Sequence, residues 1–92
     1  MFTLKYTAKF KKDYKRIKKQ GKDIAKLEET LQKLCEGAAL PENMHDHYLV
    51  GNYKDHRECH IEPEWLLIYK IENSNLILTT TRTGSHAELF NE

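Results

Sequence analysis

The sequence predicts an α+β fold in which two helices cover one face of a small, mostly antiparallel sheet. Apolar residues in the first half recur at helical spacing, whereas those in the second half alternate or run continuously as in strands. A loop around Pro41 separates the two patterns. We therefore expect the element order β-α-α-β-β-β. The 92 residues fit one domain, which we expect to span 1–92.

The first strand and the first helix follow directly from the pattern of side chains. Residues 2–6 alternate apolar and polar side chains, which indicates a short strand with one buried face. Thr7 is suited to cap a helix, because its hydroxyl can accept a hydrogen bond from a free backbone amide. One face of that helix is apolar and the other is rich in lysine; the apolar positions are Phe10, Tyr14 and Ile17.

A second helix is predicted after the break at Gly21. Asp23 is suited to cap it, and the helix should end near Gly37. Its apolar stripe consists of Ile24, Leu27, Leu31 and Leu34. The two helices should form a hairpin that covers an apolar surface, because neither is stable alone in water.

The second half predicts a three-stranded antiparallel meander. Residues 48–51 and 53–61 have strand character, and the apolar run 65–71 is typical of a central strand. A turn precedes the threonine-rich strand 76–83, and a short tail follows Gly84.

Alternation within the strand 53–61 assigns its two faces. Cys59 and Ile61 should face the helices, and Glu58 and His60 should lie on the opposite, open face. Two cysteines, Cys35 and Cys59, are too few for a disulfide framework and are interpreted as reduced structural thiols. A catalytic Cys–His pair is disfavoured, since it requires an exposed Cys59.

The charge is divided unevenly along the chain. Residues 1–34 hold eleven Lys and Arg against four Asp and Glu, whereas residues 35–92 hold four against ten. The basic half indicates either a surface for a polyanion or an acidic protein, or simply a solvated lysine-rich helix. We find no run of ~18 apolar residues and no signal peptide, so the expected location is cytoplasmic, without a membrane partner.

The histidines admit several interpretations. Four of the five lie between His45 and His60, but neither HExxH nor paired CxxC is present, so we expect no metal and no cofactor. Histidine suits proton transfer near neutral pH, as RNA cleavage through its own 2′-hydroxyl requires. The alternative is that exposed strands merely carry polar residues. The candidate residues for RNA cleavage and binding are His47, His60, Glu64, Trp65, Arg82, His86 and Phe90.

Two segments, "DHYLVGNYKDHRECHIEPEWLLIYK" and "RTGSHAELF", resemble the YafQ branch of the RelE-type toxins of bacterial type II toxin–antitoxin pairs. The resemblance covers essentially the whole chain and implies a RelE/ParE-like fold. It also implies a ribosome-dependent mRNA interferase, which cuts mRNA in the ribosomal A site and contacts ribosomal RNA. Further implied are a cognate antitoxin as inhibitor, operator DNA contacted only through the antitoxin complex, and a monomeric free toxin.

The same resemblance implies the site residues. Its catalytic histidines correspond to His47, His60 and His86, and its carboxylate to Glu64, where the family usually has Asp. As hypotheses, His86 is the general acid, His60 (or Glu64 acting through it) is the base, and His47 orients the phosphate. Arg82 would neutralise the phosphate, and Trp65 and Phe90 would hold the nucleotide.

Some neighbouring residues have no such counterpart. His45 and His56 are interpreted as exposed bystanders, and Glu58 either tunes His60 or is a plain surface acid. Two other functions remain open: a ParE-like gyrase poison without nuclease chemistry, and a binding module that acts mainly in operator control with its antitoxin.

Overall fold

The computed structural model describes residues 1–90, which form five strands, three α-helices and two short 3₁₀ helices. The elements are β1 (Thr3–Tyr6), α1 (Ala8–Lys19), α2 (Ile24–Cys35), η1 (Glu42–Met44), β2 (His47–Tyr48), η2 (Gly51–Tyr53), β3 (Arg57–Glu62), β4 (Trp65–Glu72), β5 (Ile77–Gly84) and α3 (His86–Phe90). The predicted α+β class and the order of a strand, two helices and a meander are confirmed.

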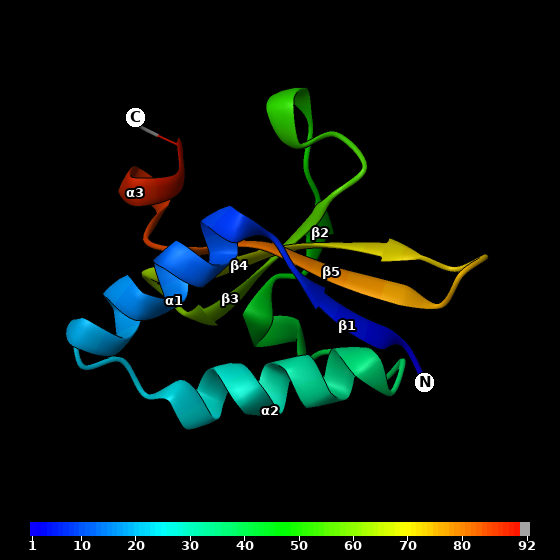
Figure 1. The fold of residues 1–92 in the computed structure, drawn as a ribbon, viewed down its shortest axis with the longest axis horizontal. Helices are drawn as coiled ribbons and strands as arrows, with labels where there is room; N and C mark the ends of the chain where they lie inside the picture. Colours follow the sequence, from blue (N-terminus) through cyan, green and yellow to red (C-terminus); the bar gives the residue numbers. More distant parts are fainter. Residues whose placement is uncertain (91–92) are drawn as a thin grey trace.

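The five strands form one sheet in the order β1-β5-β4-β3-β2 (Figure 1). Strands β2 to β5 are antiparallel neighbours, whereas β1 runs parallel to β5. The first strand of the chain therefore pairs with the last one, and the pairing ends where Tyr6 meets Thr80. The central position of β4 explains why its sequence is almost continuously apolar.

Both helices of the hairpin begin at the predicted caps. The hydroxyl of Thr7 accepts a hydrogen bond of 3.0 Å from the amide of Phe10. The carboxylate of Asp23 accepts one of 3.1 Å from the amide of Ala25. Between the helices, Gly21 has φ +78°, a left-handed conformation that favours glycine. These local signals fix where each helix starts and stops.

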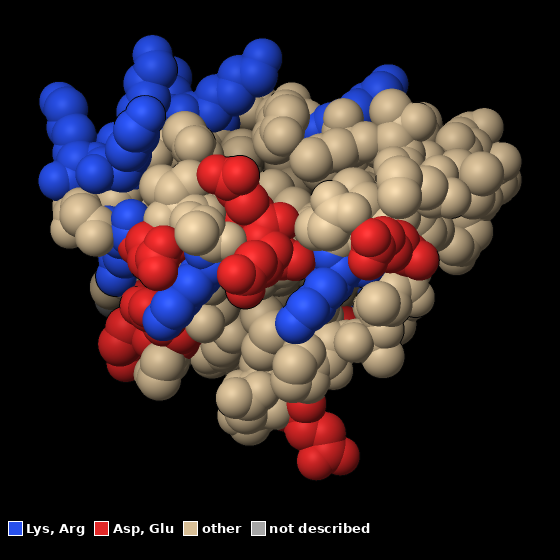
Figure 2. Space-filling model, turned by 90° about the horizontal axis from the view of Figure 1, so that it is seen from below, with Lys and Arg blue, Asp and Glu red and all other residues tan. Residues whose placement is uncertain are grey.

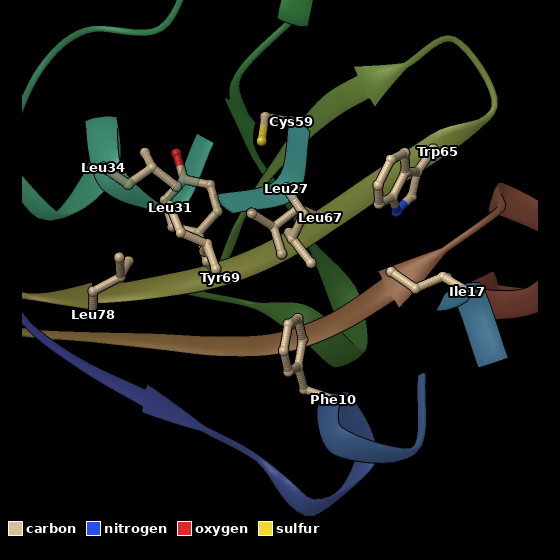
Figure 3. Packing of buried hydrophobic residues seen from close by; sticks show 10 residues of the cluster. All are labelled: Phe10, Ile17, Leu27, Leu31, Leu34, Cys59, Trp65, Leu67, Tyr69 and Leu78. Carbon is tan, nitrogen blue, oxygen red and sulfur yellow. The ribbon is translucent and has the colours of Figure 1, made fainter. Parts of the chain in front are cut away.

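The main core lies between the helices and one face of the sheet (Figure 3). Leucines of α2 pack against the inward side chains of β3 and β4, including Cys59, Leu67 and Tyr69. Cys59 is fully buried, and Ile61 packs against this cluster, so the predicted assignment of the two faces of β3 is confirmed.

Helix α1 also covers a free edge of the sheet. Beyond Tyr6 the strand β1 no longer pairs with β5, and side chains of α1 and its cap bind the exposed backbone of β5 instead. Thr7 donates to the carbonyl of Thr81 at 2.7 Å, and Arg16 donates to the carbonyl of Thr83 at 3.1 Å. These bonds satisfy backbone groups that an edge strand would otherwise leave unpaired.

The opposite face of the sheet is partly covered by the end of the described chain. The predicted tail forms a short helix, α3, whose Leu89 packs on Leu66 and Ile68 of β4. Leu49 and Tyr53, from the segment between β2 and β3, complete this second cluster. The tail therefore folds back over the face that the alternation in β3 predicts to be open, and it covers the part of that face at Leu66 and Ile68.

Charged side chains are unevenly distributed over the surface. Seen from the side of α2, Lys and Arg gather at the edge where α1 lies, and acidic side chains lie nearer the middle (Figure 2). The basic residues of α1 are Lys9, Lys11, Lys12, Lys15, Arg16, Lys18 and Lys19. Across residues 1–90, none of the helices is both long and apolar enough to span a membrane.

Candidate active site

The segment between η1 and β2 is anchored next to the predicted histidines. Asp46 accepts hydrogen bonds from the hydroxyl of Tyr69 at 2.6 Å and from Nε of Arg57 at 3.2 Å. His47 follows directly and begins β2, where it pairs with Glu58 across the strands. Because Asp46 is fixed to β3 and β4, the position of His47 is fixed relative to the sheet.

His47 and His60 meet at the carboxylate of Glu58. Oε1 of Glu58 lies 3.6 Å from Nε2 of His47 and 3.7 Å from Nε2 of His60. The residue is only 5% exposed, whereas both imidazoles reach solvent. The buried carboxylate lies between the exposed ring of His47 and the half-buried ring of His60, at ion-pair distance from both. Of the two interpretations of Glu58, the structure favours the partner of His60 over the plain surface acid.

For the RNA cleavage that the sequence resemblance implies, we expect Glu58→Gln to lower the turnover roughly tenfold to 100-fold, because the amide keeps the size but not the charge of the group between the two imidazoles. Binding should not change, since Glu58 is buried beneath the two rings. Steady-state kinetics measure both quantities. Glu72→Gln, at the far end of β4, is the matched control. A lower affinity with unchanged turnover would contradict this positioning role.

The remaining carboxylate and histidines of this region lie as follows. Glu64 is exposed in the turn between β3 and β4, and no hydrogen bond or ion pair joins it to another of residues 1–90. His45 is exposed as expected, but its ring lies edge-on to that of His60, 5.6 Å away. His56 is half-buried and contacts Tyr53, so it is not the exposed residue we expected.

His86 stands at the start of α3, which a capping box initiates. The hydroxyl of Ser85 accepts from the amide of Glu88 at 3.1 Å, and the carboxylate of Glu88 accepts from the amide of Ser85 at 2.8 Å. The ring of His86 is exposed and lies 4.8 Å from that of Phe90, which is 38% exposed. The two predicted residues of the tail therefore form a second exposed group.

Glu88 also ties α3 to the end of α1. Its Oε2 lies 3.1 Å from Nε of Arg16 and accepts a hydrogen bond of 3.1 Å from Gln20. The amide of Ser85 is the main cause that lowers the pKa of the Glu88 carboxyl, and Gln20 and Arg16 add to it. At Gly84, a Cβ would lie only 2.5 Å from the Arg16 guanidinium and 3.0 Å from Glu88. A side chain at position 84 would therefore displace the ends of the Arg16 and Glu88 side chains and strain the backbone, which has φ +156° there.

The prediction that Arg82 contacts the RNA phosphate is corrected by its burial. Its guanidinium is bound by Asp13 of α1, with Nε to Oδ2 at 2.6 Å and the other nitrogen to Oδ1 at 3.2 Å. Asp13 is 2% exposed and also accepts from the amide of Thr83 and pairs with Arg16. Arg82 thus holds α1 against β5. The sequence analysis missed Asp13, whose only local signal is that it is an acid within a basic helix.

The prediction that Trp65 stacks on a nucleotide is corrected in the same way. Trp65 is fully buried and lies on the helix side of the sheet, in the same cluster as Ile17 and Leu67 (Figure 3). Its indole nitrogen donates to the hydroxyl of Thr83 at 2.9 Å, and Lys22 lies over its ring at 5.9 Å. Its role is to support the end of β5 from which α3 leaves the sheet.

The pair His47 and His60 and the pair His86 and Phe90 lie on either side of β4, on one face of the sheet. His60 pairs with Leu66, which in turn pairs with Gly84, two residues before His86. Neighbouring strands are about 4.8 Å apart, so the backbones of His60 and Gly84 are separated by about 10 Å. One phosphate and its two flanking riboses span a comparable distance. The register and the packing of Leu89 on Leu66 therefore place α3, which carries His86 and Phe90, on the same face of the sheet as His60.

Burial makes the Cys59 thiol inert. It raises the pKa of Cys59 to about 12, with smaller contributions from Asp46 and Glu58. We expect iodoacetamide at pH 8 to leave Cys59 unmodified in the native protein and to label it fully in guanidinium, because the thiolate is the reactive form. Peptide mass spectrometry of a Cys35→Ser variant isolates this site. Rapid labelling of the folded protein would show that the thiol is accessible and ionised.

The helical hairpin on one face and the exposed histidines on the other define a small α+β protein whose free face is suited to acid–base chemistry. Residues 2–91 match the family model described as the bacterial toxin of a type II toxin–antitoxin system, YafQ. The chain belongs to the YafQ family of toxins.

Several relatives are similar over almost their whole length. The mRNA interferase toxin YafQ of Escherichia coli strain K12 is 39% identical over 88 residues, which cover 95% of this chain and 94% of that protein. The E. coli DinJ–YafQ complex matches with a TM-score of 0.88 and 37% identity, covering 98% of this chain and 99% of that one. A metal-bound toxin from Helicobacter pylori matches with a TM-score of 0.92 and 40% identity, covering 98% and 100%.

Among residues 1–90, no three or more side chains of His, Cys, Asp and Glu are grouped so as to hold a metal ion. His47 and His60 share the carboxylate of Glu58 at ion-pair distance.

Proposed function

We propose that the protein is a ribosome-dependent endoribonuclease, the toxin of a type II toxin–antitoxin pair, which cuts mRNA in the ribosomal A site. The observation that carries the proposal is the presence of two exposed groups, His47 with His60 and His86 with Phe90, on one face of the sheet. The family and the mRNA interferase activity of the E. coli relative support it.

The proposed reaction uses the 2′-hydroxyl of the RNA as the nucleophile. His60, held by Glu58, removes the proton of the 2′-hydroxyl, whose oxygen attacks the adjacent phosphorus. The bond from phosphorus to the 5′-oxygen breaks, and His86 donates a proton to that leaving oxygen. The products are a 2′,3′-cyclic phosphate and a 5′-hydroxyl, so atoms and charge balance. His47 orients the phosphate. It is placed for this role because Glu58 holds it next to His60, the proposed base.

Glu64 and Phe90 have accessory roles in this proposal. Glu64 is exposed in the turn that follows the strand of His60, with one methylene more than the family's usual Asp, and would act on the substrate or through His60. Phe90 offers an exposed ring on which a base can stack. No bound cofactor is required, since imidazoles supply both proton transfers.

The basic face of α1 would bind ribosomal RNA by contacts to phosphates, which are weakened by salt. A cognate antitoxin, comparable to DinJ in the E. coli complex, would cover the toxin and inhibit it. Operator DNA would be contacted only through that complex. The free toxin would act as a monomer in the cytoplasm.

Mapping of cleavage sites on a translated message tests the proposal. Primer extension should show cuts within codons when ribosomes are present, and far fewer on the same RNA without ribosomes. A DNA supercoiling reaction in parallel tests the ParE-like alternative. Intact mRNA together with inhibited gyrase would overturn the nuclease proposal. Growth that is unaffected when the toxin is induced without an antitoxin would favour the module for operator control.

A further inference from the structure

A cavity of about 480 Å³ lies beside the second exposed group. It is lined by Lys9, Val50, Asn52, Tyr53, Leu89 and Phe90. Three separate segments contribute to it: the start of α1, the segment around η2, and the end of α3. Its volume falls within the range typical of small-ligand sites, about 300 to 1,000 Å³.

The aromatic rings at the cavity connect it to the proposed reaction centre. The ring of Phe90 lies 4.8 Å from His86 and stands edge-on to Tyr53 at 5.9 Å. Phe90 therefore contacts His86 on one side and lines the cavity on the other. A group that enters the cavity is therefore separated from His86, the proposed general acid, only by the ring of Phe90.

The polar side chains at the cavity suit one nucleotide of single-stranded RNA. Asn52 is exposed, and its amide makes no hydrogen bond within residues 1–90, so both its donor and its acceptor are available. Lys9 is exposed at the rim and provides a positive charge for a phosphate. Val50, 88% exposed, adds an apolar surface. Stacking on aromatic rings together with hydrogen bonds to base edges is how proteins read unpaired bases.

We propose that this cavity is a nucleobase subsite that sets the sequence preference of cleavage. A base next to the scissile phosphate stacks on Phe90, and Asn52 reads its edge while Lys9 holds the neighbouring phosphate. This inference rests on the proposed nuclease function and extends it, because it assigns recognition of one base of the RNA to Asn52 and Lys9, which take no part in the proposed proton transfers.

Cleavage mapping with two matched variants tests the subsite. Asn52→Ala removes the amide at the cavity, and Asn73→Ala removes an exposed amide in the distant turn between β4 and β5. Primer extension across a long translated message gives the frequency of each base at every position around the cuts. For Asn52→Ala we expect discrimination at one position to fall about tenfold. Asn73→Ala should keep the wild-type pattern, and both variants should keep the wild-type melting temperature.

The outcomes separate the two proposals. If wild-type protein produces cuts but Asn52→Ala shows the same base frequencies, the subsite is overturned and the nuclease function stands. The subsite is also overturned if Asn73→Ala changes the frequencies equally. If wild-type protein produces no cuts, the nuclease function fails. The subsite is then tested by titrating the protein with four single-stranded oligonucleotides that differ at one base, and equal affinities overturn it.

Discussion

Replacement of His86 by Ala is expected to lower the rate of mRNA cleavage by about 100- to 10,000-fold, the usual contribution of a positioned general acid. The imidazole is exposed at the start of α3, its ring lies 4.8 Å from that of Phe90, and within residues 1–90 no hydrogen bond or ion pair holds its side chain. The capping box of Ser85 and Glu88 does not involve it, so the fold should persist. Single-turnover cleavage on ribosomal complexes measures the rate, and growth after induction measures toxicity.

His56→Ala is the control for this experiment. His56 contacts Tyr53 but lies outside both histidine groups, so its removal should leave the rate within a few-fold of wild type. Full toxicity and wild-type cleavage by the His86→Ala protein would show that another group protonates the leaving oxygen. An equal loss in both variants would indicate general damage to the face rather than a missing acid.

Replacement of Asp13 by Leu is expected to lower the free energy of unfolding by about 3 to 5 kcal/mol, because it removes the buried carboxylate that binds the Arg82 guanidinium and the amide of Thr83. Asp13 is 2% exposed and binds Arg82, Arg16 and the amide of Thr83. Urea unfolding at neutral pH, followed by circular dichroism, measures the loss. Glu28→Gln, on the exposed face of α2, should change the value by less than about 0.5 kcal/mol.

A second variant keeps this prediction testable if Asp13→Leu does not fold. Combining it with Arg82→Met replaces the ion pair by apolar side chains of similar size, which typically restores stability. We expect the double variant to be more stable than the single one. Additive destabilisation, with each change acting independently of the other, would mean that the two residues are not coupled.

Features set by neighbouring residues could be predicted from the sequence. The caps Thr7 and Asp23 each accept a hydrogen bond from a backbone amide within three residues. The start of each helix is therefore determined by the local sequence. Alternation in β3 correctly predicted that Cys59 and His60 point to opposite faces of the sheet, because successive side chains of a strand always alternate between its two faces. The capping box at Ser85 was also readable, and it would have changed the predicted tail into a helix.

Features set by distant residues could not be predicted in this way. Arg82 was expected to neutralise the phosphate, whereas the structure buries its guanidinium against Asp13, which lies 69 residues away in the sequence. The burial of Trp65 depends on α1, α2 and Lys22 closing over the end of β4. Strand β1 pairs parallel to β5 across more than 70 residues, which no local pattern specifies. The resemblance gave Trp65 a nucleotide-holding role but did not indicate whether the side chain was exposed, and the structure buries it.

The short outer strands of the sheet bear on how the free protein behaves at high concentration. The two edges are β1, with four residues, and β2, with two, and α1 occupies the part of β5 that β1 leaves uncovered. Short or covered edges offer few backbone groups to another chain and so discourage strand-to-strand aggregation. We expect the protein to remain dispersed when it is produced without a partner, so that its activity can be measured on the isolated chain.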